Sequence, residues 1–159
     1  MTTNPPARTR SASRLFALLV GVTFLLVGVL GFVPGVTTSY DQLSLAGRES
    51  GALLLGLFAV SVLHNLVHLA FGVAGVFMAR TTKLARAYLI GGGIIYAVLG
   101  VYGLVIDQDS AANLVPVNTA DNWLHLGLAV GMIALGVLGG ALDRRTHPAS
   151  SSTPRTATT

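Results

Sequence analysis

The stretch LFAVSVLHNLVHL at residues 57–69 aligns without a gap to the stretch LVPVNTADNWLHL at residues 114–126. A leucine at each end, a valine, an asparagine and a histidine are identical at an offset of 57 residues. The glycine spacing upstream repeats as well, because Gly21, Gly28 and Gly31 recur 72 residues later. We interpret each half as one helical hairpin, duplicated. If both helices of a hairpin cross a membrane, the chain returns to the side from which it started, and the second hairpin begins in the same orientation as the first. The sequence therefore predicts parallel repeats, related by an axis along the membrane normal.

The composition is typical of a membrane protein. Apolar residues make up 52% of the 159 residues and charged residues only 10%, with a mean hydropathy of +0.70. A soluble domain carries about 25% charged residues, so a water-soluble globular domain and a disordered chain are excluded. Cysteine is absent, which excludes disulfides, thiolate metal sites and a cysteine nucleophile.

Four apolar segments are long enough to cross a bilayer. A spanning helix needs about 20 residues, because each residue rises 1.5 Å through a hydrocarbon core of roughly 30 Å. We therefore predict an all-α fold, a four-helix transmembrane bundle within residues 14–143. The predicted spans are 15–33, 62–79, 87–106 and 120–142.

The second apolar segment is longer than one upright span, since residues 52–79 would form a helix of about 42 Å. The repeat suggests where it divides. Ser61 and Asn118 are aligned, and serine and asparagine are favoured N-caps. Asn118 is followed three residues later by Asp121, which resembles a capping box, and Pro116 is a poor residue for a helix interior.

These signals predict that the second span begins near Val62 and the fourth near Thr119. The preceding segment, residues 49–58, is then expected to be a short interfacial helix in the first outer loop. The alternative is a single strongly tilted helix over residues 52–79.

The charges divide between the two sides of the predicted membrane. Nine of the ten basic residues precede the first span, lie in the connection 80–86 or follow the fourth span, whereas on the opposite side Arg48 is the only basic residue beside five acidic ones. The positive-inside rule therefore predicts a multi-pass protein of the cell membrane with both termini cytoplasmic. Residues 1–13 and 144–159 are predicted to be disordered, solvated tails. The basic charge thus sets orientation, and no nucleic-acid partner is expected.

Polar side chains occur at equivalent depth in the two halves. His64 and His68 are four residues apart on one helical face, and Asp121 and His125 have the same relation. If the two halves are related by a twofold axis, His68 and His125 approach each other across it, flanked by His64 and Asp121. The remaining members of this polar cluster are Ser61, Asn65, Asn118 and Asn122.

Three interpretations of this cluster stay open. The favoured one is structural: neutral histidines and asparagines hydrogen-bond between helices and no cofactor is present. A zinc or haem site could use His64, His68 and His125, with Asp121 as a further ligand. A small-solute or proton transporter is the third. An enzyme is not expected, because no nucleophile with a base and no phosphate-binding loop is visible.

Glycine-rich faces are suited to close helix packing. Gly127 with Gly131, and Gly136 with Gly140, form two GxxxG pairs in the last span. Packing within the chain is the favoured interpretation, and a homo-oligomer within the lipid bilayer is the alternative.

The segments HNLVHLAFGVAGVFMART and LVPVNTADNWLHLGLAVGMIALG carry a resemblance. They are similar to a family of small, mainly actinobacterial membrane proteins catalogued as domain of unknown function 4383. The resemblance covers about residues 13–142 and implies a four-helix integral membrane protein. It brings no activity, cofactor or catalytic residue. Related sequences often have asparagine where this chain has Ser61, which keeps a capping residue.

Overall fold

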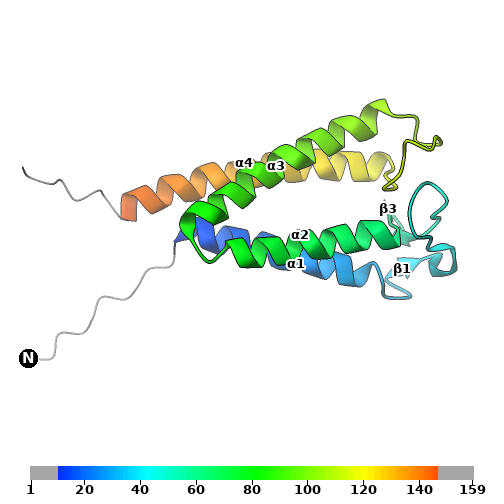
Figure 1. The fold of residues 1–159 in the computed structure, drawn as a ribbon, viewed down its shortest axis with the longest axis horizontal. Helices are drawn as coiled ribbons and strands as arrows, with labels where there is room; N and C mark the ends of the chain where they lie inside the picture. Colours follow the sequence, from blue (N-terminus) through cyan, green and yellow to red (C-terminus); the bar gives the residue numbers. More distant parts are fainter. Residues whose placement is uncertain (1–10, 147–159) are drawn as a thin grey trace, which may run out of the picture.

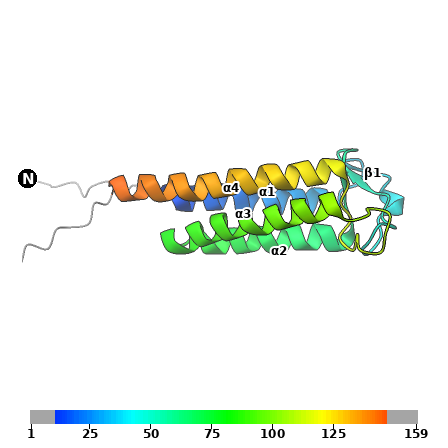
Figure 2. The ribbon, with the colours of Figure 1, turned by 90° about the horizontal axis from the view of Figure 1, so that it is seen from above.

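Four α-helices make up most of the structure (Figure 1). The computed structural model describes residues 11–146, so the predicted tails at 1–10 and 147–159 lie outside the described residues. The helical fold class is confirmed. α1 packs mainly against α2, and α3 mainly against α4, so that two helix pairs lie along each other (Figure 2). The helices are α1 (Ala12–Leu30), α2 (Val62–Met78), α3 (Thr82–Val105) and α4 (Thr119–Thr146).

The ends of the bundle differ in charge. The start of α1, the short α2–α3 turn and the end of α4 lie together, and the two long loops, residues 31–61 and 106–118, lie at the opposite end (Figure 1). We call the first the basic end and the second the acidic end. The basic residues at the basic end are Arg14, Arg80, Lys83, Arg86, Arg144 and Arg145.

α2 and α4 begin at the residues where the sequence predicts. The Ser61 hydroxyl accepts a hydrogen bond of 3.1 Å from the backbone N–H of His64 and caps α2. At the start of α4, Asn118 Oδ1 accepts from the Asp121 N–H at 3.0 Å, and Asp121 Oδ2 accepts from the Asn118 N–H at 2.9 Å. This reciprocal pair is a capping box, so both predicted caps are confirmed.

Asp143 ties α4 to the start of α1 at the basic end. Its carboxylate accepts from the Ser11 hydroxyl at 2.9 Å and from the Ala12 N–H at 2.7 Å, which places an anion at a helix N-terminus. Partial burial opposes ionisation, but these hydrogen bonds outweigh it and hold the pKa of the Asp143 carboxyl below its usual value. Residues 12–13 and 144–146 are helical, whereas we predicted them to belong to disordered tails.

The predicted interfacial helix at 49–58 is wrong. The first long loop instead contains a small antiparallel sheet in which β1, β2 and β3 pair in that order, and a short 3-10 helix, η1, lies between β1 and β2. A tight turn at Leu55 and Gly56, whose φ values are 56° and 70°, joins β2 to β3. The elements are β1 (Thr37–Thr38), η1 (Tyr40–Gln42), β2 (Leu53–Leu54) and β3 (Phe58–Ala59).

The physical reason lies in the backbone of the turn. Left-handed φ values at Leu55 and Gly56 cannot continue a right-handed helix, so a single tilted helix over residues 52–79 is wrong as well. A short apolar run bounded by turn residues is compatible with a strand as much as with a helix. Its apolar content alone led to the helical prediction.

Burial in α2 is the reverse of that in a soluble protein. Its exposed side chains include Leu66, Val73 and Phe77, each at least half exposed. A helix in water would bury such residues against a core. α1, α3 and α4 are long and apolar enough to cross a membrane, and α2, with 17 residues, is a shorter apolar helix. The buried residues of α2 are His64, Asn65, His68, Gly72 and Gly75.

An aromatic cluster joins the two helix pairs at mid-height. Phe24 of α1 stacks on Tyr96 of α3 with ring centroids 5.3 Å apart. Phe71 of α2 meets both rings edge-on, at 5.2 Å from Phe24 and 5.5 Å from Tyr96. Such pairs contribute about 0.5–1.5 kcal/mol each beyond area burial, and here they connect three helices.

Glycines allow the closest helix approaches. Gly31 lies against the side-chain amide of Asn65, and Gly103 lies against that of Asn122, so closely that an added Cβ would collide with the amide. We call these two pairs the glycine–asparagine contacts. Gly91, by contrast, has open space around it.

The two GxxxG pairs of α4 differ in their surroundings. Gly136 faces Ile90 and Gly140 faces Arg86, so this pair packs within the chain. Gly127 and Gly131 have open space where a Cβ would point. Association of two copies through that open pair stays a prediction.

We predict that Gly103→Ala destabilises the protein and that Gly91→Ala does not. The new methyl group at 103 must displace the Asn122 amide, and overpacking of this kind costs about 1–3 kcal/mol. At 91 the methyl group meets nothing, and the better helix propensity of alanine adds up to about 1 kcal/mol. Unfolding of both variants in detergent micelles measures the difference. Equal stability of the two variants would contradict the close approach at Gly103.

Candidate functional site

Polar side chains at the acidic end form two groups with different contacts. In the first group, Asp121 and Asn118 join the start of α4 to the segment before α2. Asp121 Oδ2 accepts from the backbone N–H of Ala59 at 2.9 Å, in addition to its capping bond. Asn118 Nδ2 donates to the carbonyl of Leu57 at 2.8 Å. We call this arrangement the Asp121 bridge. Because Asp121 is buried, water does not compete for these bonds.

Asn65 and Asn122 are fully buried beside the glycines described above. Asn122 Nδ2 donates to the carbonyl of Gly103 at 2.7 Å. Asn65 Nδ2 has no hydrogen-bond partner among residues 11–146. The two asparagines therefore occupy similar positions against neighbouring helices but differ in hydrogen bonding.

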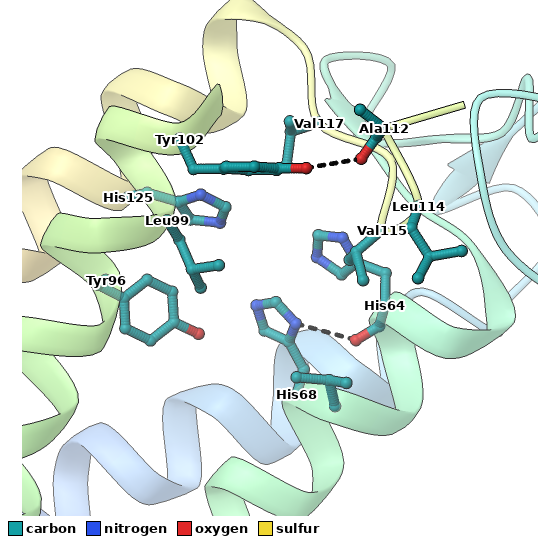
Figure 3. Close-up of a pocket in the computed structure, with 11 residues that line it drawn as sticks. His64, His68, Tyr96, Leu99, Tyr102, Ala112, Leu114, Val115, Val117 and His125 are labelled. Atoms are coloured by element: carbon teal, nitrogen blue, oxygen red, sulfur yellow. Dashed lines mark hydrogen bonds between the residues drawn. The ribbon is translucent and has the colours of Figure 1, made fainter. Parts of the chain in front are cut away.

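The second group consists of the three predicted histidines, which line one cavity of about 200 Å³ (Figure 3). His64 and His68 come from α2 and His125 from α4. Tyr96 of α3 also lines the cavity, and its remaining walls are side chains of α2, α3 and loop 106–118. We call it the histidine cavity. Asp121 does not line it.

The histidine rings have a defined geometry. The rings of His64 and His68 stack with centroids 4.4 Å apart and an interplanar angle of 5°. His68 Nδ1 lies 3.1 Å from the carbonyl oxygen of His64. A carbonyl only accepts, so Nδ1 carries the hydrogen and donates. In a neutral ring, Nε2 of His68 is then a hydrogen-bond acceptor.

The cavity favours neutral rings. No carboxylate of the described chain lines it, and two stacked imidazolium rings would repel each other. The side chains of His64 and His125 are each only 5% exposed. Nδ1 of each ring has no hydrogen-bond partner within residues 11–146. A buried polar atom without a partner costs about 1–3 kcal/mol, so these two ring nitrogens carry an unmet hydrogen-bonding cost.

Two tyrosines beside the histidines, Tyr96 and Tyr102, were not predicted from the sequence. The Tyr102 hydroxyl donates to the Ala112 carbonyl at 2.9 Å, which fixes loop 106–118 beside the histidines (Figure 3). The Tyr96 ring lies 5.3 Å from that of His125. A tyrosine within an apolar span could have indicated a nearby polar site, because a buried hydroxyl usually needs a polar partner.

The predicted zinc-like set is not assembled. Within residues 11–146, no group of three or more histidine, aspartate or glutamate side chains is arranged to hold a metal ion. Asp121, the one carboxylate in the predicted set, instead accepts from two backbone N–H groups as a helix cap and bridge. The structure thus brings together His64, His68 and His125 without their expected fourth partner.

These features define a mostly helical protein whose apolar helices are compatible with a membrane protein. Residues 14–138 match the family described as Domain of unknown function (DUF4383), and the chain belongs to that family. No curated protein and no solved structure matches the chain. The family description names no activity, so the function must be argued from the site.

Proposed function

We propose that the protein is a four-span integral membrane protein with both termini in the cytoplasm. The exposed leucines, valines and phenylalanines of the helices support this, because such a surface is suited to lipid. α2 has 17 residues and a length of about 25 Å, close to the lower limit for a span. Trp123, 65% exposed at the start of α4, is suited to the outer membrane interface.

We further propose that the two helix pairs arose by duplication and are inserted in the membrane in the same orientation. Three glycine contacts support this: each has a counterpart in the second pair, displaced by 72 residues on one helix and by 57 on the other. Gly21 faces Val76, Gly28 faces Leu69 and Gly31 faces Asn65, while Gly93 faces Ile133, Gly100 faces Leu126 and Gly103 faces Asn122.

The role that the geometry supports best is structural and non-enzymatic. The observation that carries it is the Asp121 bridge, in which the buried carboxylate binds Ala59 of the first half and Asn118 of the second. This arrangement fixes the two halves against each other at the acidic end. The same arrangement occupies Oδ2 of Asp121 with two backbone N–H groups, which favours a capping and bridging role over zinc ligation.

We predict that Asp121→Ala lowers the free energy of unfolding by about 2–4 kcal/mol, because it leaves the buried N–H groups of Ala59 and Asn118 without acceptors. Asp109→Ala is the matched control, because Asp109 is exposed in loop 106–118 at the same, acidic end. This variant should change the free energy of unfolding by less than about 0.5 kcal/mol. Thermal unfolding in detergent measures both.

The same preparations separate the structural role from a metal or haem role. We expect the wild-type protein to contain no stoichiometric metal and no Soret band. Zinc at one per chain, or a Soret band, lost in both His68→Ala and His125→Ala, would overturn the structural proposal. Equal stability of Asp121→Ala and Asp109→Ala would overturn it as well.

The proposed orientation predicts which positions a membrane-impermeant maleimide reaches. The chain has no cysteine, so Ala7→Cys, Ala149→Cys and Ala111→Cys each introduce a single target. In intact cells Ala111→Cys, in the loop of the acidic end, should be labelled. Ala7→Cys and Ala149→Cys should be labelled only after permeabilisation. Labelling of either tail in intact cells would contradict the orientation.

A further inference from the structure

The Asp121 bridge does not involve the three histidines, and among them only His68 Nδ1 makes a hydrogen bond described above, to the His64 carbonyl. The histidine cavity lies where α2 and α3, close together at their α2–α3 turn, diverge toward the acidic end (Figure 1). His64, His68 and His125 at its base are buried. The cavity therefore has a polar base in a part of the bundle where the helices do not close on each other.

The rim of the cavity is apolar and exposed. Val67 of α2 and Leu99 of α3 line it and are 45% and 40% exposed, and Leu114 of loop 106–118 is 62% exposed. Both helix positions belong to the surface that we assign to lipid, so the opening faces the membrane sideways. This step rests on the proposed membrane insertion. A ligand reaching the histidines by this route must dissolve in the bilayer.

The base of the cavity selects the polar group of such a ligand. His68 Nδ1 is engaged by the His64 carbonyl, so the free Nε2 of a neutral His68 accepts a hydrogen bond. Figure 3 shows the ring of His68 between those of His64 and Tyr96, at the edge of the open space. The complementary ligand group is a hydroxyl or N–H donor without charge. Nδ1 of His64 and Nδ1 of His125 are buried away from the open space, so His68 Nε2 is the nitrogen that makes this selection.

The volume of the histidine cavity limits the size of the ligand. A cavity of about 150 Å³ holds one benzene ring, and the histidine cavity measures about 200 Å³. One six-membered ring with a hydroxyl group therefore fits, with any aliphatic tail leaving between Val67 and Leu99. The Tyr96 ring and the stacked imidazoles supply aromatic faces for it.

We propose that the histidine cavity is a binding site for a neutral, lipid-soluble phenol, whose hydroxyl donates to Nε2 of His68 and whose tail extends into the bilayer. This site is separate from the Asp121 bridge, so it can fail while the structural role holds.

The probe is 4-propylphenol, and 4-propylanisole is its matched analogue without a hydroxyl hydrogen. Calorimetric titration of the full-length protein in lipid nanodiscs, corrected with empty nanodiscs, measures binding beyond partition into lipid. We expect one 4-propylphenol per chain and at least about tenfold weaker binding of 4-propylanisole, the ratio that one hydrogen bond of about 1.4 kcal/mol provides. Equal binding of the two probes, or partition alone, would overturn the proposal.

Two variants locate the site. Leu99→Trp fills the rim of the cavity and should weaken 4-propylphenol binding at least tenfold. The control is Val98→Trp. Val98 is the neighbouring residue, is 63% exposed and does not line the cavity, so this variant should bind 4-propylphenol like the wild type. Leu114→Trp replaces Leu99→Trp if the latter lowers the thermal midpoint more than Val98→Trp does. Unchanged binding in the rim variant would place the phenol elsewhere. Asp121→Ala stability is measured separately, so failure of the phenol site and failure of the structural role are distinguishable.

Discussion

Close approach of helix backbones through glycine is the constraint on which the rest of this structure depends. Many large apolar side chains of the helices point outward, so burial against the small shared core around Phe24, Leu89 and Tyr96 supplies only part of what holds the helices together. Van der Waals contact and buried hydrogen bonds must replace that driving force, and both require short distances between helices. Both glycine–asparagine contacts provide this close contact, because each glycine leaves room for an amide of the neighbouring helix. The contact at Gly103 adds a buried hydrogen bond, from Asn122 Nδ2 to the Gly103 carbonyl.

The acidic end follows from this constraint. Once the asparagines are fixed by glycine, the residues around them on α2 and α4 have defined directions. Asp121 faces the segment before α2 and accepts its backbone N–H group, while His68 and His125 face the space between the helices. Residues of similar polarity and depth thus serve two purposes: some satisfy backbone groups, and others line a cavity.

Much of this arrangement could be predicted from the sequence, because it depends on local chemistry and periodicity. Ser61 and Asn118 cap helices through their own neighbours in the chain, so spacing alone identifies them. The clustering of the histidines follows from helical spacing and the repeat. These predictions needed no knowledge of the loops.

The rest depends on contacts that sequence spacing does not encode. The small sheet in the first loop forms through pairing of residues 37–38 with 53–54, a non-local choice that apolar content cannot reveal. Asp121 was expected beside the histidines, but a backbone N–H group 62 positions away takes its carboxylate. Tyr102 joins the cavity only because loop 106–118 folds back to it.

A pair of double-mutant cycles tests the central claim most directly. One cycle combines Gly31→Ala with Asn65→Ala, and the other combines Gly103→Ala with Asn122→Ala. Because the asparagine side chain is what an added Cβ meets at each glycine, removing it should relieve the collision. We expect each double variant to be more stable than the sum of its single variants implies, by about 0.5–3 kcal/mol in both halves. Additive effects in either cycle would contradict the account.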